Sequence, residues 1–201
     1  TDPDPLNIIL NADRDADQDG GVDIEDVTFT TNNGYLVAGG GNGIIDSDGN
    51  GILGDAGTGP DVTEAVGTSN TPSLHGVRTA TSVYDTGAGD IIFHGGASSA
   101  GGNIGLALFS SNFTTSSGNI VFRGSTDSSI ANQRGIQFNT NVETDSGQVT
   151  IFGENNNTTG TNNEGIRLAS GSITSNVSGV IEITGIATSD DGSSQGINLS
   201  G

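Results

Sequence analysis

The sequence predicts an all-β protein, a parallel β-helix (β-solenoid) with about 30 residues per coil and three short strands in each coil. Three observations predict this fold: a strand-like string that returns along the chain, a second glycine motif that returns at nearly the same spacing, and glycine at the boundaries of both. A period of this length is typical of solenoids, because one coil alone cannot bury its apolar face and depends on its neighbours.

The last strand of each coil, called C here, carries the clearest signal. Its pattern is Gly-x-aliphatic-x-apolar-x-Gly, as in SGNIVFRG at 117–124, and it returns every 29 to 32 residues from Gly89 to Gly179. Alternation with a period of two is the mark of a strand with one buried face. We therefore expect the following residues to point inward in stacked columns: Ile120, Phe122, Val149, Ile151, Ile181 and Ile183.

The first two strands of each coil, called A and B, are shorter. Strand A follows a glycine in the strings HGVRT, IGLAL, RGIQF, EGIRL and QGINL, which recur from Gly76 to Gly196. Strand B is marked by one apolar residue in a polar stretch, assigned to Val83, Phe113, Val142 and Ile173. Glycine at each boundary and β-branched apolar residues disfavour helices.

The N-terminal part follows the same order of strands. Residues 6–10 are predicted as C, 21–24 as A, Phe29 as B and 34–40 as C. The step from Gly21 to Gly76 is 55 residues, so one loop carries an insertion of about 25 residues. We predict a single domain over 1–201, with its first coils at 6–40, the insertion at 41–74 and regular coils at 75–201.

Composition restricts the partners. The chain has 24 acidic and 5 basic residues and a net charge of −19, which argues against nucleic acid and anionic membranes as partners. It has no cysteine, so it has neither disulfides nor thiolate metal sites. No apolar run approaches the roughly 18 residues that a membrane span needs, so we expect no membrane insertion.

The repeats, together with the lead-in strings ILNADRDADQDGG and TTNNGYLVAGGG, resemble the β-helical shafts of filamentous-haemagglutinin-type secreted bacterial proteins. This resemblance covers nearly the whole chain. It implies an exported adhesin or fibre protein, located outside the cell or on the bacterial cell surface.

The predicted outward column of strand A consists of Asp23, Arg78, Ala107, Gln137, Arg167 and Asn198. The two predicted outward columns of strand C consist of Tyr35, Asp90, Asn119, Gln148 and Val180, and of Val37, Ile92, Val121, Thr150 and Glu182. None of them places two acids on adjacent coils, which a carbohydrate-active β-helix would need for acid/base chemistry. Glu143 and Asp145 lie in series along one strand and read best as a solvated edge.

The two histidines, His75 and His94, read best as polar turn residues rather than as a metal or catalytic pair. The sequence contains no nucleophile elbow, zinc-protease motif or phosphate loop. We therefore predict no catalytic residues, no organic cofactor and no enzymatic activity.

Two acidic loops predict structural calcium sites. In DADQDGGVDIED, acids and a glycine fall at the positions of an EF-hand-type loop, where alternate oxygens converge on one cation. The string DSDGNGILGD is a looser version within the insertion. The alternative is that Asp, Asn and Gly simply form turns. The candidate ligands are Asp15, Asp17, Asp19, Asp23 and Asp26 in the first loop and Asp46, Asp48, Asn50 and Asp55 in the second.

The leading functional prediction is a non-catalytic structural segment of an extracellular fibre or adhesin, stabilised by calcium. The end coils present open strand edges, so we expect self-association end to end or continuation into a longer chain. One alternative is a module that binds a glycan or a surface, and a less favoured one is a carbohydrate-active enzyme. Sugar sites favour exposed aromatic residues, and only Tyr35 and Tyr84 were candidates for that role.

Overall fold

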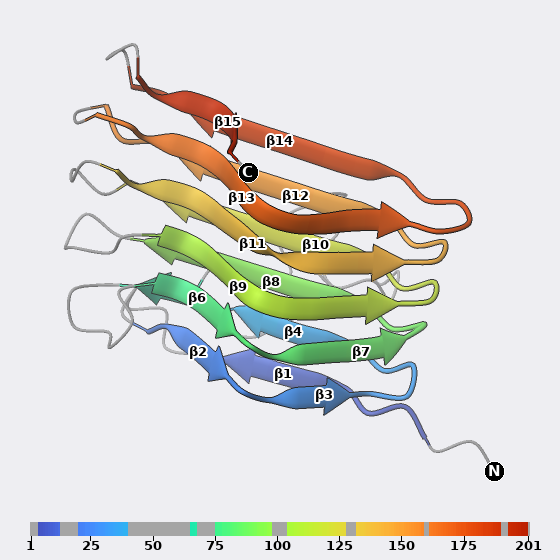
Figure 1. Ribbon diagram of the computed structural model, residues 1–201. Coiled ribbons are helices and arrows are strands. Elements are labelled where there is room, and N and C mark those ends of the chain that lie inside the picture. The colour runs from blue at the N-terminus through green and yellow to red at the C-terminus, as the bar shows by residue number, and fades with distance from the viewer. Residues whose placement is uncertain are drawn as a thin grey trace, which may run out of the picture.

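The computed structural model describes residues 4–12, 20–39, 65–67, 75–97, 104–127, 132–158, 161–189 and 193–200. All regular structure in these ranges is β-strand, and the strands pair in parallel, which confirms the predicted β-solenoid. Figure 1 shows the layers following one another from the N-terminal to the C-terminal end of the molecule. Within the described residues there is no helix of the length and apolarity that crossing a membrane requires.

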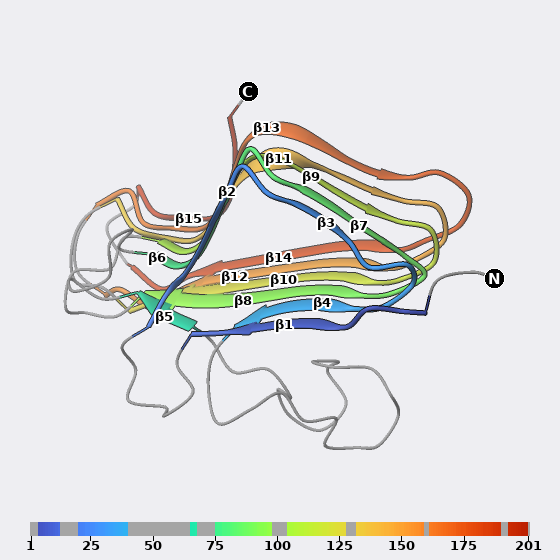
Figure 2. The same cartoon turned by 90° about the horizontal axis from the view of Figure 1, so that it is seen from below.

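Three strand positions surround the core, and Figure 2 shows them enclosing a roughly triangular interior. The C sheet consists of β1 (Ile8–Asn11), β4 (Leu36–Gly39), β5 (Ala65–Gly67), β8 (Ile91–Ala97), β10 (Ile120–Thr126), β12 (Val149–Asn155) and β14 (Ile181–Ala187). The A and B positions are held by β2 (Val22–Glu25), β3 (Thr28–Thr30), β6 (His75–Ala80), β7 (Val83–Gly87), β9 (Ile104–Thr115), β11 (Arg134–Thr144), β13 (Glu164–Ser175) and β15 (Gln195–Leu199). In β9, β11 and β13 one long strand supplies both positions.

The predicted inward columns of the C sheet are confirmed. Ile120 is opposite Val149, and Phe122 is opposite Ile151, and all four side chains are fully buried. The columns continue to Ile181 and Ile183 in β14. Ile181 nevertheless has 41% of its surface exposed, because β14 is the last strand in the order of the C sheet.

The predicted register of the B strand is wrong by one residue in one coil. Val83 was expected to point inward, but it points outward and is 39% exposed, whereas Tyr84 is fully buried. Tyr84 pairs with Phe29 on one side and Phe113 on the other, and its ring stacks on Phe113 at a centroid distance of 4.5 Å. The burial of a larger aromatic surface favours this register over one that buries valine.

The insertion interrupts a C strand. β4 pairs with β8 as far as Ala38 opposite Phe93, and β5 (Ala65–Gly67) then pairs with the end of the same strand, from Gly95 to Ala97. The predicted insertion at 41–74 therefore includes a short strand that belongs to the C sheet. The rest of the insertion, 41–64 and 68–74, lies outside the described residues.

A column of buried hydroxyl groups forms the corner before each C strand. The Thr86 hydroxyl donates to the Gly89 carbonyl (2.6 Å) and the Thr115 hydroxyl to the Gly118 carbonyl (2.7 Å). The hydroxyl groups of Thr115 and Thr144, in neighbouring coils, are also hydrogen-bonded to each other (3.0 Å). These bonds satisfy polar groups inside the stack, which would otherwise cost stability.

We predict that Val149→Asp lowers the free energy of unfolding by about 3–5 kcal/mol, because it places an unpaired carboxylate in a column without water. Gln148→Asp is the matched control, since Gln148 is exposed on the adjacent outward position. Chemical denaturation of both variants measures the difference. Equal stability of the two variants would contradict the inward orientation of Val149.

Candidate functional site at the C-terminal end

The outward columns have the predicted register. On strand A, the column of Asp23, Arg78, Ala107, Gln137, Arg167 and Asn198 is continuous from β2 to β15. The predicted pair of acids in series, Glu143 and Asp145, is bridged by Asn176, whose amide donates to both carboxylates (2.6 and 3.2 Å). This arrangement makes the two acids a cross-coil hydrogen-bond site.

Two of the predicted calcium ligands have other partners. Asp23 accepts a hydrogen bond from Arg78 at 2.6 Å across the coils. Asp26 accepts one from the Thr81 hydroxyl and has a positive φ of 55°, as a turn residue does. The other candidates lie outside the described residues: Asp15, Asp17, Asp19, Asp46, Asp48, Asn50 and Asp55. In the described ranges no cluster of three or more metal-ligating side chains occurs, so calcium binding stays a prediction.

The two histidines lie in different sheets. His75 begins β6 at the A position and pairs with Ile104, whereas His94 lies in β8 at the C position and pairs with Arg123. Burial, aided by the charge of Arg78, lowers the pKa of His75 to about 4. Its Nδ1 atom is buried without a hydrogen-bond partner. His75 is therefore a neutral residue of the A strand at physiological pH.

The two tyrosines considered for a sugar-binding site are not fully exposed: Tyr84 is buried and Tyr35 is partly buried. Tyr84 is fully buried and donates to or accepts from the Thr79 hydroxyl (2.5 Å), so it is a core residue. Tyr35 packs with Val121 against the buried side chains of Val37 and Ile92, on the outer face of the C sheet. Val37 and Ile92 occupy predicted outward positions, so part of this outer face is a second apolar cluster instead of a solvated surface.

Exposed apolar side chains concentrate at the two ends of the stack. Ten large hydrophobic residues are exposed among the described residues, and nine of them lie in the first or last layer: Leu6, Ile9, Val27, Val177, Val180, Ile181, Ile186, Ile197 and Leu199. The tenth, Val83, lies between these layers. Because buried columns need a neighbour on both sides, the last layer at each end leaves its apolar side chains half covered.

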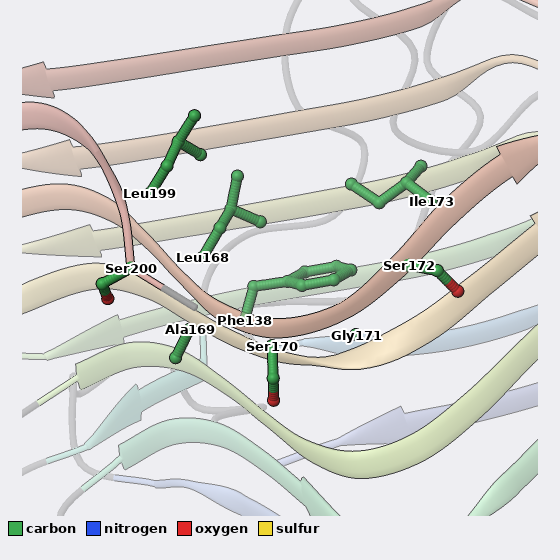
Figure 3. A pocket seen from close by; sticks show the side chains of 9 residues that line it. All are labelled: Phe138, Leu168, Ala169, Ser170, Gly171, Ser172, Ile173, Leu199 and Ser200. Atoms are coloured by element: carbon green, nitrogen blue, oxygen red, sulfur yellow. The ribbon is translucent and has the colours of Figure 1, made fainter.

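The C-terminal end also contains a groove of about 350 Å³. Phe138, which is only 1% exposed, forms its floor, while Leu168 and Ile173 of β13 line its sides. Leu199 and Ser200 form its rim, and Leu199 is 74% exposed. In Figure 3 the apolar side chains of Leu168, Ile173 and Leu199 point to the same side, whereas Ser170 and Ser172 point away from them.

The groove lies where strand pairing stops. β15 pairs with β13 as far as Leu168 opposite Leu199, and the Ser200 amide donates to the Leu168 carbonyl (3.0 Å). Beyond this point, residues 170–175 of β13 pair only with β11 within the described part of the chain. The groove therefore combines an apolar floor with an open backbone edge.

Open strand edges at the ends were expected from the sequence, but the groove was not. Its floor and rim, Phe138 and Leu199, are far apart in the chain and meet only through stacking. Comparison of the chain with family models, curated proteins and solved structures found no match.

We predict that His75 makes folding sensitive to acid. Its pKa is about 4 when folded and near 6.5 when unfolded, so the unfolded chain binds more protons between these values. The contribution of this residue to stability is therefore complete above pH 6.5 and falls as the pH decreases toward 4. Denaturation of the wild type, His75→Gln and His94→Gln at several pH values measures this. We expect His94→Gln to keep the pH dependence of the wild-type stability and His75→Gln to lose it. If His75→Gln keeps it, the assignment is contradicted.

We also predict that calcium raises the melting temperature of the protein through the first acidic loop. A ligand that binds only the folded state at a hundredfold excess over Kd stabilises it by about 2.7 kcal/mol. Thermal melts with calcium and with a chelator measure the effect. Asp17→Asn and Asp19→Asn together should abolish it, whereas Asp85→Asn, on the outward face of β7, should not. A melting temperature indifferent to the chelator would leave only the turn interpretation.

Proposed function

We propose that this chain is a non-catalytic structural segment of an extracellular or cell-surface fibre-like protein, in which β-solenoid units join end to end. The observation that carries the proposal is the position of the exposed apolar side chains, nine of ten in the first and last layers. Contiguous apolar surface on a folded protein marks an interaction site. Three of these side chains, Ile181, Ile197 and Leu199, end inward columns at the strand edges where further coils can be added.

The sides of the solenoid support the same function. Acidic side chains occupy outward positions on the lateral strands, as Asp85, Glu143 and Glu182 do, and all three are exposed. With a net charge of −19, two molecules repel each other side by side. Association through the ends brings together apolar columns and backbone edges instead, and it favours linear growth.

The extracellular location is proposed on two grounds. The repeats resemble those of filamentous-haemagglutinin-type adhesins, which are exported proteins. Weak calcium sites of the predicted type suit extracellular conditions, where calcium is at millimolar levels. In this proposal calcium has a structural role in the first coil.

We predict that the protein assembles into linear particles at high concentration in about 1 M salt, where the Debye length is about 3 Å and lateral repulsion is screened. Ile197→Asp, on the end strand β15, should weaken assembly at least tenfold. Val83→Asp is the matched control, because Val83 has nearly the same exposure, 39% against 40%, but lies on a lateral face. Sedimentation analysis and electron microscopy provide the measurements.

Thermal melts of both variants show whether they remain folded. A wild-type protein that stays monomeric under these conditions, with ordered terminal coils, would contradict end-to-end joining. So would equal loss of assembly in the two variants.

A further inference from the structure

We propose that the outer face of the C sheet over β4 and β8 is a docking surface for the insertion of this same chain, residues 40–64, whose apolar side chains pack on Val37 and Ile92. These residues of the insertion lie outside the described part of the chain. The docking surface is a lateral face, so its occupant is independent of how the ends of the solenoid join.

Val37 and Ile92 are buried although their side chains point outward. They follow Leu36 and Ile91, which face the core, and they are only 0% and 2% exposed. Within the described residues, their apolar neighbours outside the core are Tyr35 and Val121, which lie in the same outer face. Side chains that stand beside one another on a sheet do not close its outer side, so a further segment has to cover Val37 and Ile92.

The cover is local. The outward column that contains Val37 consists of Ile9, Val37, Ile92, Val121, Thr150 and Glu182. Ile9 is 46% exposed at one end of this column and Glu182 is exposed at the other, while Val121 and Thr150 are partly buried. Full burial is therefore confined to β4 and β8, and the column becomes polar where the burial ends.

The insertion leaves and re-enters the sheet at the same place. β4 pairs with β8 as far as Ala38, and β5 resumes the pairing at Ala65 after a single residue of β8, His94. Gly39 and Ala65 are thus successive positions of one interrupted C strand. β1 and β8 occupy the two edges of β4, and the core fills its inner side (Figure 2). A segment that departs from this point has only the outer side of the sheet open to it.

The composition of the insertion matches an apolar cover. It contains five large aliphatic residues, Ile44, Ile45, Ile52, Leu53 and Val62. Each of the other segments outside the described residues contains at most one, Leu74 in 68–74 and Ile130 in 128–131. Packing these side chains on Val37 and Ile92 removes apolar surface of both partners from water, which stabilises the contact. A polar ligand would leave the two aliphatic side chains without an apolar partner.

Methyl NMR of the full chain tests the contact directly. We expect nuclear Overhauser effects between the Ile92 methyl groups and methyl groups of the insertion. A soluble paramagnetic agent, which relaxes methyl groups according to their contact with solvent, should leave Val37 and Ile92 as protected as Ile120 of the core. Overhauser effects of Ile92 restricted to Tyr35, Val121 and other residues of the sheet would overturn the docking.

The test variant combines Ile44→Ser, Ile45→Ser, Ile52→Ser and Leu53→Ser. The matched control combines Asn42→Ser, Ser47→Thr, Thr58→Ser and Thr63→Ser, four polar changes in the same segment. Paramagnetic relaxation of the Val37 and Ile92 methyl groups should rise at least threefold in the test variant and stay at the wild-type level in the control. Relaxation of Ile120 should stay unchanged in both, which shows that the core remains folded. Equal protection of Val37 and Ile92 in the two variants would overturn the proposal.

A second copy of the chain is the competing occupant of this face. A mixture of isotope-labelled and unlabelled protein distinguishes the two, because contacts within one molecule are absent from the isotope-filtered spectrum of the mixture. We expect no filtered signal at Ile92. A filtered signal there that grows with protein concentration would assign the face to a second copy and overturn docking of the insertion.

Discussion

The parallel, in-register pairing of successive coils is the constraint on which the rest of this structure depends. Each strand hydrogen-bonds to the same strand of the next coil, so a residue in one coil lies against its equivalents about 4.8 Å away. The corner glycines show how tightly this packing is set. A Cβ atom at Gly118 would lie 1.9 Å from the carbonyl oxygen of Gly89, which no real side chain tolerates.

This constraint arranges the equivalent residues of successive coils in columns. Inward positions hold apolar side chains, and near the corner they hold hydroxyl groups that bond to the following turn and to each other. Outward side-chain oxygens also accept hydrogen bonds between coils: the backbone N–H of Asn119 donates to the Asp90 carboxylate (2.6 Å), and the backbone N–H of Gln148 donates to the side-chain oxygen of Asn119 (3.0 Å). Burial raises the pKa of Asp90, and the hydrogen bond from Asn119 opposes this shift. Stability and surface pattern therefore have the same origin.

The same pairing makes the two ends different from every interior layer. An interior strand has two neighbours, whereas β14, β15 and the second half of β13 have one each in the described part of the chain. Their apolar columns stop at partly covered residues such as Ile181 and Ile183. A fold that is held together by adding coils thus presents, at its end, a surface suited to one more strand. The proposed function follows from this geometry.

The sequence by itself determined the fold class, the length of the coil and the inward columns of the C strands, because these depend on a local alternation repeated many times. It also placed the outward column from Asp23 to Asn198 correctly. It did not predict that Tyr84 rather than Val83 points inward, since a single apolar pair in a polar stretch fits either register. The calcium ligands of the first loop were inferred from spacing, and the structure gives Asp23 and Asp26 other partners without testing the rest.

Only the tertiary structure decided where the surface is apolar. Val37 and Ile92 have outward positions in sequence and are nevertheless buried, because burial depends on what lies over a strand as well as on the direction of its side chains. The groove over Phe138 has the same cause: its residues come from three coils, and it exists because one strand position beside Ile173 has no neighbour. Periodicity specifies what repeats, whereas a site formed where the repeat is interrupted requires the positions of the coils in space.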